Sequence, residues 1–247
     1  MFAMLEDLGA NVSLIAGGDI MTAKCDMRRI EQDSRDRFPT LKTLSQLVIV
    51  YFVVTLCVVA AAQERMGRIP AEKMTPAQKR AADEFLQDRG KPITGPFIPL
   101  LRSPEVLIRA KAMGDYLRFK SALPAKLREL AILVTARQWS QQFEWFHHSG
   151  FASEAGLSPN IIKAVSEGRR PEGMSESEDV VYDFCTELLR NHSVSDATYA
   201  KAIAAFGDQG TIDLVSLTGY YTFVSMVLNV NRTPLPKGAT PLPMFPN

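Results

Sequence analysis

Residues 140–158, SQQFEWFHHSGFASEAGLS, hold the side chains of this sequence that are best suited to proton transfer. Positions four apart share a face of a helix, so Glu144 and His148 can touch there, while His147 lies one position further round. A carboxylate beside an imidazole fixes its tautomer and raises its basicity, which suits the pair for acid–base catalysis near neutral pH. From spacing alone, the alternative is an exposed ion pair on a solvated helix.

Two features favour a sheltered site over an exposed ion pair. Aromatic residues stand at positions 143, 145, 146 and 151, so this helix is apolar over much of its circumference and the pair is expected to be partly desolvated. The preceding predicted helix carries Glu129 beside the apolar run LAILV, where an unpaired charge is costly. Glu129 therefore needs a polar partner, and the face that carries Glu144 and His148 is the candidate.

Helices have to position these side chains, because the chain from residue 75 onward reads as helices joined by short turns rich in proline and glycine. Most of them open on a capping residue or a proline, and several stop at a glycine. The predicted helices cover residues 75–90, 103–121, 124–139, 140–156, 158–168, 175–191, 195–207 and 211–230. No strand alternation appears in this part of the chain, so the predicted fold is all-α.

Three details of these helices are specific enough to compare with a structure. Ser140 is the predicted cap of the helix that holds the His pair, and His192 is the predicted C-terminal cap of the helix 175–191. In the helix 103–121, the predicted buried stripe is Val106, Ala110, Met113 and Leu117. The helix 211–230 has the length of a membrane span, about 20 residues, but Asp213 and its hydroxyl-bearing residues favour a buried helix of an oligomer.

Composition and charge argue against several classes of protein. The 247 residues are 46% hydrophobic with a net charge of +1, which indicates a globular protein without a basic surface for nucleic acid. Cys25, Cys57 and Cys185 form no C-x-x-C motif and have no partner at metal-ligand spacing, so neither a disulfide framework nor a metal site is predicted. Cys185 follows helical spacing among apolar residues, which indicates a buried residue rather than a reactive thiol.

The apolar run at residues 47–62, LVIVYFVVTLCVVAAA, has the pattern of a secretory signal peptide with cleavage after Ala62. Residues 1–46 are expected to be an unstructured extension, with Met27 as a candidate for the true start. Cleavage would leave an exported, periplasmic protein that is not attached to the membrane. A retained N-terminal anchor is the alternative, although the run is shorter than a membrane span.

The segment LRELAILVTARQWSQQFEWFHHSGFASEAGLSPNIIKAV resembles the core of the carboxymuconolactone decarboxylase family, within the alkylhydroperoxidase D-like superfamily. The family patterns R-E-L-x-I-L, E-W-x-x-H and A-x-x-A-G-L-S fall within residues 128–158. The resemblance extends over most of residues 96–236, preceded by an N-terminal helix and proline-rich connector at 63–95 and followed by a proline-rich tail at 237–247. It implies an all-α, alkylhydroperoxidase D-like helical bundle that is oligomeric and uses no cofactor and no metal.

The resemblance also assigns residues. Carried over by position, Glu129 and His148 match the glutamate and histidine of the two family motifs, and Glu144 matches the glutamate of the decarboxylase branch. These three are the implied catalytic residues, in a pocket at a subunit interface. Trp145 and His147 are candidate substrate-binding residues.

One branch of the superfamily differs from this sequence at two positions. The alkylhydroperoxidase D branch carries a redox C-x-x-C pair where this chain has Gln141 and Glu144. The resemblance therefore implies that the thiol chemistry of that branch is absent here.

The function implied by the resemblance is a decarboxylase or isomerase, a type of carbon–carbon lyase that transfers protons between Glu and His side chains and a small carboxylated lactone or keto acid. Its partners would be this small molecule and copies of itself, as a dimer, trimer or hexamer, and not nucleic acid. Two alternatives stay open. One is an alkylhydroperoxidase D-type antioxidant peroxidase, which the missing cysteines contradict, and the other is a non-catalytic ligand-binding protein on the same scaffold.

Overall fold

The computed structural model describes residues 11–16, 19–24 and 63–243, and the chain divides into two compact units, Met1–Ala61 and Ala62–Asn247. In the first unit, β1 (Asn11–Ala16) pairs with β2 (Asp19–Lys24) as an antiparallel hairpin. This differs from the expectation that residues 1–46 have no structure. The sequence signal was two six-residue runs separated by Gly17-Gly18, a typical hairpin connection. The predicted signal peptide, residues 47–62, lies outside the described residues.

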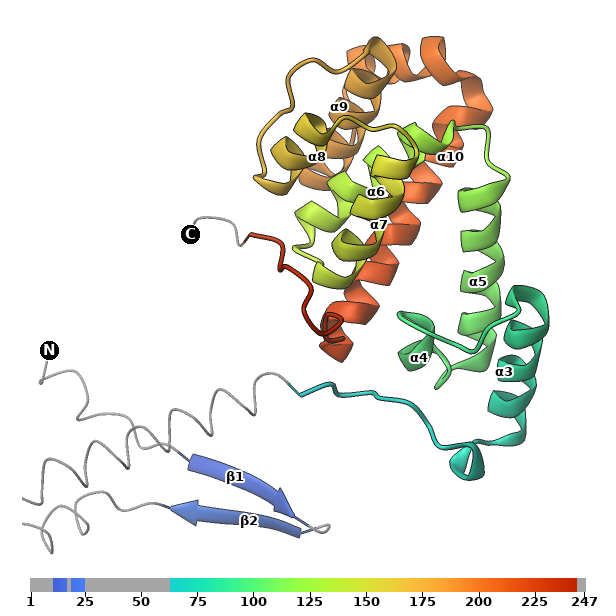
Figure 1. Ribbon diagram of the computed structural model, residues 1–247, viewed down its shortest axis with the longest axis vertical. Coiled ribbons are helices and arrows are strands. Elements are labelled where there is room, and N and C mark those ends of the chain that lie inside the picture. The colour runs from blue at the N-terminus through green and yellow to red at the C-terminus, as the bar shows by residue number, and fades with distance from the viewer. Residues whose placement is uncertain (1–10, 17–18, 25–62, 244–247) are drawn as a thin grey trace, which may run out of the picture. The chain divides into compact units, whose positions relative to one another are not determined.

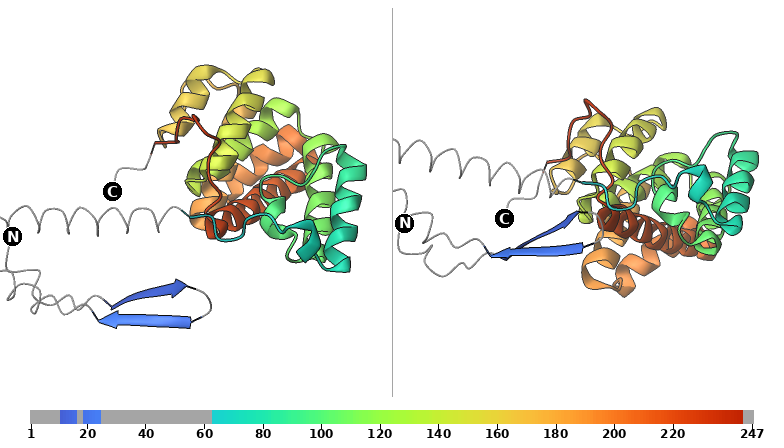
Figure 2. Two further views of the ribbon diagram at one scale, coloured as in Figure 1. Left: turned by 60° about the horizontal axis from the view of Figure 1, so that its bottom comes forward. Right: turned by 90° about the horizontal axis from the view of Figure 1, so that it is seen from below.

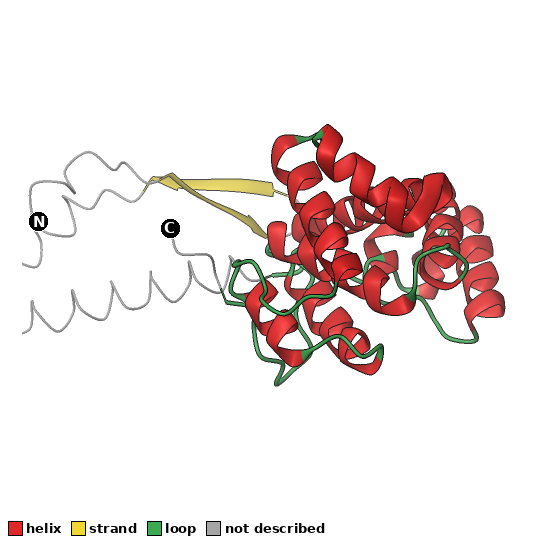
Figure 3. Ribbon diagram, turned by 90° about the horizontal axis from the view of Figure 1, so that it is seen from above, coloured by secondary structure: helices red, strands yellow, loops and turns green. Residues whose placement is uncertain are grey.

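The second unit is helical throughout its described part, residues 63–243, which confirms the all-α prediction for this unit (Figures 1 and 3). Thr75, with a capping box to Gln78, opens the first long helix, and Gly90 ends it with a φ of 65°. The elements in chain order are η1 (Ala71–Lys73), α3 (Pro76–Arg89), α4 (Phe97–Leu100), α5 (Pro104–Phe119), α6 (Ala125–Gln138), α7 (Gln142–Glu154), α8 (Pro159–Ser166), α9 (Glu176–Asn191) and α10 (Asp196–Asn231).

Helix α6 lies at the centre of this unit, where it packs against α7, α8, α9 and α10. Every residue from 129 to 137 is buried, so α6 is enclosed on all sides for more than two turns. Helix α10 runs along α5, α6 and α9 (Figure 2). A second, smaller core holds α3, α4 and α5 together around Phe85, Phe97 and Leu107. The site residues of α6 and α7 therefore sit between the two longest helical contacts of the unit.

Two of the predicted helix boundaries are found in α9 and α10. Helix α10 contains a break at Gly207, where φ is 65°, a conformation that glycine adopts without a steric cost. The break separates the two helices that the sequence predicts on either side of it. His192 has a φ of 58° and caps the C-terminus of α9, as predicted.

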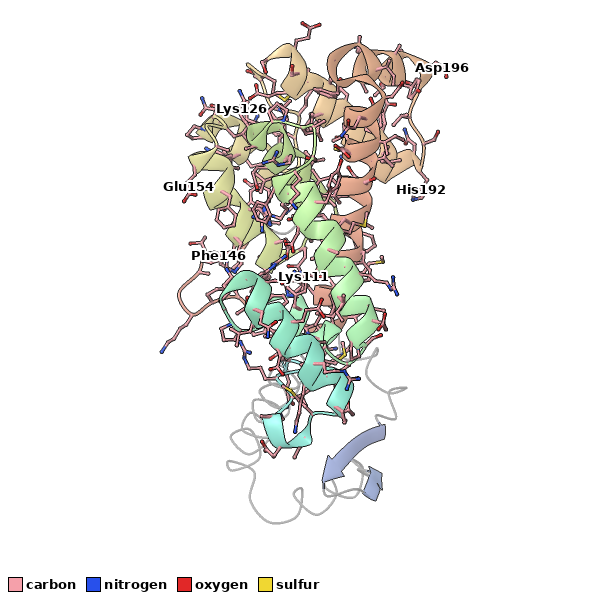
Figure 4. All side chains as sticks on the ribbon, turned by 90° about the vertical axis from the view of Figure 1, so that its right-hand side faces the viewer. Lys111, Lys126, Phe146, Glu154, His192 and Asp196 are labelled. Atoms are coloured by element: carbon pink, nitrogen blue, oxygen red, sulfur yellow. The ribbon has the colours of Figure 1, made fainter. Side chains whose placement is uncertain are left out.

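The buried face of α5 differs from the predicted one. Val106 and Met113 are 41% and 44% exposed, whereas the buried residues of α5 are Leu107, Lys111, Gly114 and Leu117. Lys111 can be buried because its ammonium group donates to Asp88 at 2.7 Å and to Asp115 at 3.0 Å (Figure 4). Hydrophobicity alone indicated the wrong stripe, since a paired lysine and a glycine occupy the inner face.

Both ends of this unit are attached to the bundle. The Met66 N–H donates to Asn231 Oδ1 at 2.6 Å, next to the end of α10. Leu242 of the proline-rich tail is buried in the main core, and its N–H donates to Gln142 Oε1 at 2.6 Å. The tail was predicted to cover the surface or a neighbouring subunit. In the structure it packs on α6 and α7 of its own chain, with Arg137 donating to the Pro243 oxygen.

Among the described residues, α10 is the one helix long and apolar enough to cross a membrane. More than half of its most apolar stretch is buried in the unit, as in the core helix of a soluble protein. Its charged residue in that half, Asp213, is buried and accepts hydrogen bonds from the Tyr116 hydroxyl at 3.2 Å and the Ala122 N–H at 2.8 Å. These contacts favour the prediction of a buried helix over that of a membrane span.

Candidate functional site

The packing of α6 on α7 brings the three predicted catalytic side chains together. His148 Nδ1 lies 2.6 Å from Glu129 Oε2, and its Nε2 lies 3.3 Å from Glu144 Oε2. All three residues are buried, with at most 8% of each exposed. The exposed ion pair that spacing alone suggested is therefore not what the structure contains. Glu129, His148 and Glu144 form a buried carboxylate–imidazole–carboxylate cluster.

Tyr221 of α10 is a fourth member that the sequence analysis did not assign to the site. Its hydroxyl lies 3.2 Å from His148 Nε2, and the two rings meet edge to face with centroids 5.0 Å apart. Tyr221 belongs to the run of hydroxyl-bearing residues in the last apolar helix, which the sequence analysis interpreted only as a sign of burial in an oligomer. A buried tyrosine usually has a hydrogen-bond partner for its hydroxyl, and here that partner is His148.

The start of α7 is fixed by Gln141 rather than by Ser140. The Gln141 side-chain oxygen accepts hydrogen bonds from the N–H groups of Phe143 at 2.6 Å and Glu144 at 3.1 Å. Its amide nitrogen donates to Asn229 Oδ1 at 2.9 Å, which ties the start of α7 to α10. Ser140 instead has a φ of 46°. Glu144 thus lies in the first turn of α7, where the helix dipole favours a carboxylate.

A cavity of about 180 Å³ opens beside this cluster. Glu144, His148 and Tyr221 form part of its wall, together with several aromatic rings and three cationic side chains. The remaining lining residues are Arg89, Lys91, Thr94, Gly95, Pro96, Phe97, Gly114, Arg118, Phe143, His147, Phe151, Tyr220 and Val224. A ligand in this cavity would lie against the Nε2 side of His148.

Two of the predicted site residues do not line this cavity. Glu129 contacts His148 from behind, so the structure gives it a positioning role rather than contact with a ligand. Trp145 packs in the main core, because one step along a helix turns the side chain by about 100° away from Glu144. His147 does line the cavity, where its ring packs on Phe143 with centroids 4.4 Å apart.

His148 is held in its charged form by its two carboxylate partners. Burial by itself lowers the pKa of His148, but the hydrogen bonds and negative charges of Glu129 and Glu144 outweigh it and raise the pKa above the ordinary 6.5. Both ring nitrogens of an imidazolium are donors, so Nδ1–H donates to Glu129 and Nε2–H points toward Glu144 and the Tyr221 oxygen. Burial raises the pKa of Tyr221 well above 10, so its hydroxyl keeps its proton.

The other candidate groups differ from His148 in their titration. Partial burial lowers the pKa of His147, and the charges of His148 and Arg118 add to this against the attraction of Glu144. Cys185 is fully buried in α9, and this burial raises its pKa to about 12. Within residues 63–243, no group of three or more His, Cys, Asp and Glu side chains is arranged to hold a metal ion. The cluster thus combines a charged acid, His148, with a carboxylate base, Glu144, at the wall of one cavity.

Tyr221→Phe is expected to lower the free energy of unfolding by about 0.5–1.5 kcal/mol, because it removes one hydrogen bond without leaving an unpaired polar group on residue 221. His148 Nε2 keeps Glu144 as a partner. Chemical denaturation of the two proteins measures this difference. Phe223→Tyr, on the same helix, controls for effects of a phenol elsewhere on α10. A loss larger than about 3 kcal/mol would show that Tyr221 supports the fold by more than this contact.

Comparison with known proteins gives one family and a set of structures with the same fold. Residues 104–182, from the start of α5 into α9, match the model of the carboxymuconolactone decarboxylase family. This range includes Glu129, Glu144 and His148. No curated protein matches the sequence.

The similar structures belong to the alkylhydroperoxidase D-like proteins. A protein of unknown function from Agrobacterium tumefaciens, provisionally assigned to the antioxidant defence proteins AhpD, has 18% identity and a TM-score of 0.51, covering 56% of this chain and 94% of its own. A peroxidase-related protein with an AhpD core from Ralstonia eutropha has 15% identity and a TM-score of 0.56, covering 71% and 95%. The debrominase Bmp8, bound to 2,3,4-tribromopyrrole, has 10% identity and a TM-score of 0.56, covering 71% and 93%. These likenesses support the fold.

Proposed function

Because residues 104–182 place this chain in the carboxymuconolactone decarboxylase family, we propose that it is a decarboxylase or isomerase acting by proton transfer on a small carboxylated lactone or keto acid. The observation that carries this proposal is the buried imidazolium of His148 between Glu129 and Glu144, with its Nε2 side at a cavity of about 180 Å³. Perturbed titratable groups at a cavity are typical of catalytic sites.

For a keto acid, the cluster supplies both a stabilising group and a proton. Loss of carbon dioxide breaks a carbon–carbon bond and leaves its electron pair on the substrate as an enolate. The Tyr221 O–H and the His148 Nε2–H stabilise this negative charge by hydrogen bonding. His148 then gives its Nε2 proton to the substrate carbon, and water returns a proton to the imidazole. The net reaction consumes one proton and releases carbon dioxide.

For a lactone, the same groups move a proton from one carbon to another. The Glu144 carboxylate accepts the proton next to the carbonyl group, while His148 and Tyr221 stabilise the enolate that forms. Return of the proton to a different carbon completes the isomerisation. Glu129 keeps Nδ1–H of His148 occupied, so Nε2 is the nitrogen that faces the substrate.

Two alternative functions have less support. Thiol redox chemistry would need cysteines where this chain has Gln141, which caps α7, and Glu144. Cys185, the cysteine within residues 63–243, is buried with a pKa of about 12, so it is a poor nucleophile. A ligand-binding protein without activity would have no need of a buried Glu129 beside His148, because burial of charged groups costs free energy.

We also infer that the chain associates with a second copy through the solvent-facing side of α10. This side carries exposed, uncharged residues, and the positions 212, 219 and 226 recur every seven residues, the spacing of a seam between two helices. Those residues are Ile212, Val215, Gly219, Met226 and Val230. A second copy presents the same surface, so each can cover the other.

Light scattering tests this association. The wild-type protein is expected to have a mass that is a multiple of the chain's own mass, and Gly219→Glu is expected to reduce it to a monomer, since nothing within 4 Å of this glycine in its own chain restricts a side chain. A wild-type monomer would contradict the inference. Export through residues 47–62 stays a prediction, and it would place the substrate outside the cytoplasm.

A screen of the purified protein against lactones and β-keto acids tests the proposed function. Release of carbon dioxide or a change of ultraviolet absorbance reports turnover. We expect at least one substrate to react with the wild-type protein and not with His148→Asn, which removes the proton donor. Equal turnover by the two proteins would place the reaction at another site and contradict the proposal.

A further inference from the structure

Arg118 of α5 lines the cavity, but it has no acidic partner. Its Nε is buried without a hydrogen-bond partner, and no hydrogen bond or ion pair joins its guanidinium to another residue of the described chain. Its contacts are the faces of two aromatic rings, Phe119 at 5.1 Å and Phe151 at 5.4 Å from ring centroid to Cζ. A half-buried guanidinium with free donors beside a cavity is a site for an anion.

The two other cations of the cavity are placed differently. Arg89 forms an ion pair with Asp115 and lies over the rings of Phe85 and Phe97, so its charge is already paired within the protein. Lys91 is exposed to solvent, where a flexible ammonium group contributes little to binding. Arg118 is therefore the cavity cation whose charge is left for a ligand.

The position of Arg118 relative to the cluster follows from Phe151. The Arg118 guanidinium lies over the Phe151 ring, and the same ring meets the edge of His148 with centroids 5.6 Å apart. One phenyl ring thus separates the free cation from the proton-transfer group. A planar ligand of about the size of benzene with one carboxylate spans this separation, since an apolar cavity of about 150 Å³ can hold benzene.

We propose that Arg118 binds a carboxylate that stays on the substrate, and that it thereby orients an unsaturated, planar part of the molecule toward His148 and Glu144. This rests on the proposed function for the reacting end, but the binding step is independent of turnover. An arginine that holds a carboxylate stabilises it in its charged form and opposes its loss. The group that reacts is therefore at the other end of the substrate, next to Tyr221 and His148.

Binding of benzoate and of benzamide to the protein tests this assignment. The two probes have nearly the same shape, but only benzoate carries a charge. Titration followed by NMR or calorimetry is expected to show benzoate binding to the wild-type protein and benzamide binding at least tenfold more weakly. Arg118→Gln is expected to weaken benzoate about 10-fold to 100-fold, the range of a lost charged hydrogen bond, and to leave benzamide unchanged.

Matched variants make the result specific. Arg109→Gln, on the same helix but exposed and paired with Glu105, is expected to bind benzoate as the wild-type protein does. Arg118→Lys keeps the charge but loses the planar fork, and an intermediate affinity is expected. Equal affinities of the wild-type protein for benzoate and benzamide, unchanged benzoate binding in Arg118→Gln, or no benzoate binding to the wild-type protein would each overturn the assignment.

Failure of this inference and failure of the proposed function are distinguishable. If Arg118 binds benzoate but no substrate turns over, the carboxylate site stands and the proposed reaction is wrong. If substrates turn over with Arg118→Gln as they do with the wild-type protein, the reaction stands and Arg118 has no part in it. Circular dichroism confirms that each variant is folded before its affinity is compared.

Discussion

Glu144→Gln is expected to lower turnover roughly 10²-fold to 10⁴-fold, the contribution of a positioned acid or base. Glutamine has almost the same shape as glutamate, but it cannot accept a proton from carbon at neutral pH. It also removes one of the two negative charges that hold His148 in its charged form. The measurement is kcat and KM on a substrate found by the screen, and we expect the loss in kcat.

Glu154→Gln is the matched control for this prediction. Glu154 is an exposed glutamate at the other end of the same helix, far along α7 from the cluster (Figure 4). Its replacement is expected to change neither kcat nor KM. If Glu144→Gln retained wild-type kcat, Glu144 would not be the base, and the reaction would have to be assigned to His148 and Tyr221 alone.

His148→Leu is expected to lower the free energy of unfolding by about 3–5 kcal/mol near neutral pH. Leucine fills a similar volume but leaves the carboxylates of Glu129 and Glu144 buried without the charge between them. Removal of one partner from a buried ionic cluster is among the most destabilising substitutions, because the remaining charges stay desolvated.

The pH dependence of this loss has a definite sign. The folded-state pKa of His148 is raised, so the imidazolium contributes its full stability below the ordinary pKa of 6.5, and this contribution is lost as the pH rises through the folded-state pKa. The difference between the wild-type protein and His148→Leu should therefore become smaller at alkaline pH. Urea denaturation across the pH range measures it, with the exposed His147→Leu as the control. A difference that grows with rising pH would contradict a charged His148.

The core of the site could be predicted from the sequence because its signals are local. Glu144 and His148 are four residues apart on one helix, and Glu129 stands in a run so apolar that its charge needs a partner. The structure joins these three through a single helix pair, α6 and α7. Tyr221 could not be assigned in this way, because it reaches His148 from 73 residues away and depends on how α10 packs.

The misplaced residues share a physical cause. Helix α7 is apolar over most of its circumference, so periodicity does not show that Trp145 faces the core while His147 faces the cavity. The inner face of α5 carries Lys111 and Gly114, residue types that sequence patterns place outside. Gly114 is needed there because a Cβ at this position would lie 2.3 Å from the Tyr220 hydroxyl at the cavity wall. Long-range packing, rather than local preference, decides these positions.

Titration of His148 by nitrogen-15 NMR tests the buried cluster most directly, and it requires no substrate. The spectrum reports whether each ring nitrogen carries a proton, and Glu129→Gln identifies the carboxylate that holds Nδ1–H. We expect both nitrogens of His148 to be protonated at neutral pH, with a pKa above 6.5 that falls when Glu129 is replaced. A neutral His148 ring at neutral pH, or a pKa that does not respond to Glu129→Gln, would contradict the account.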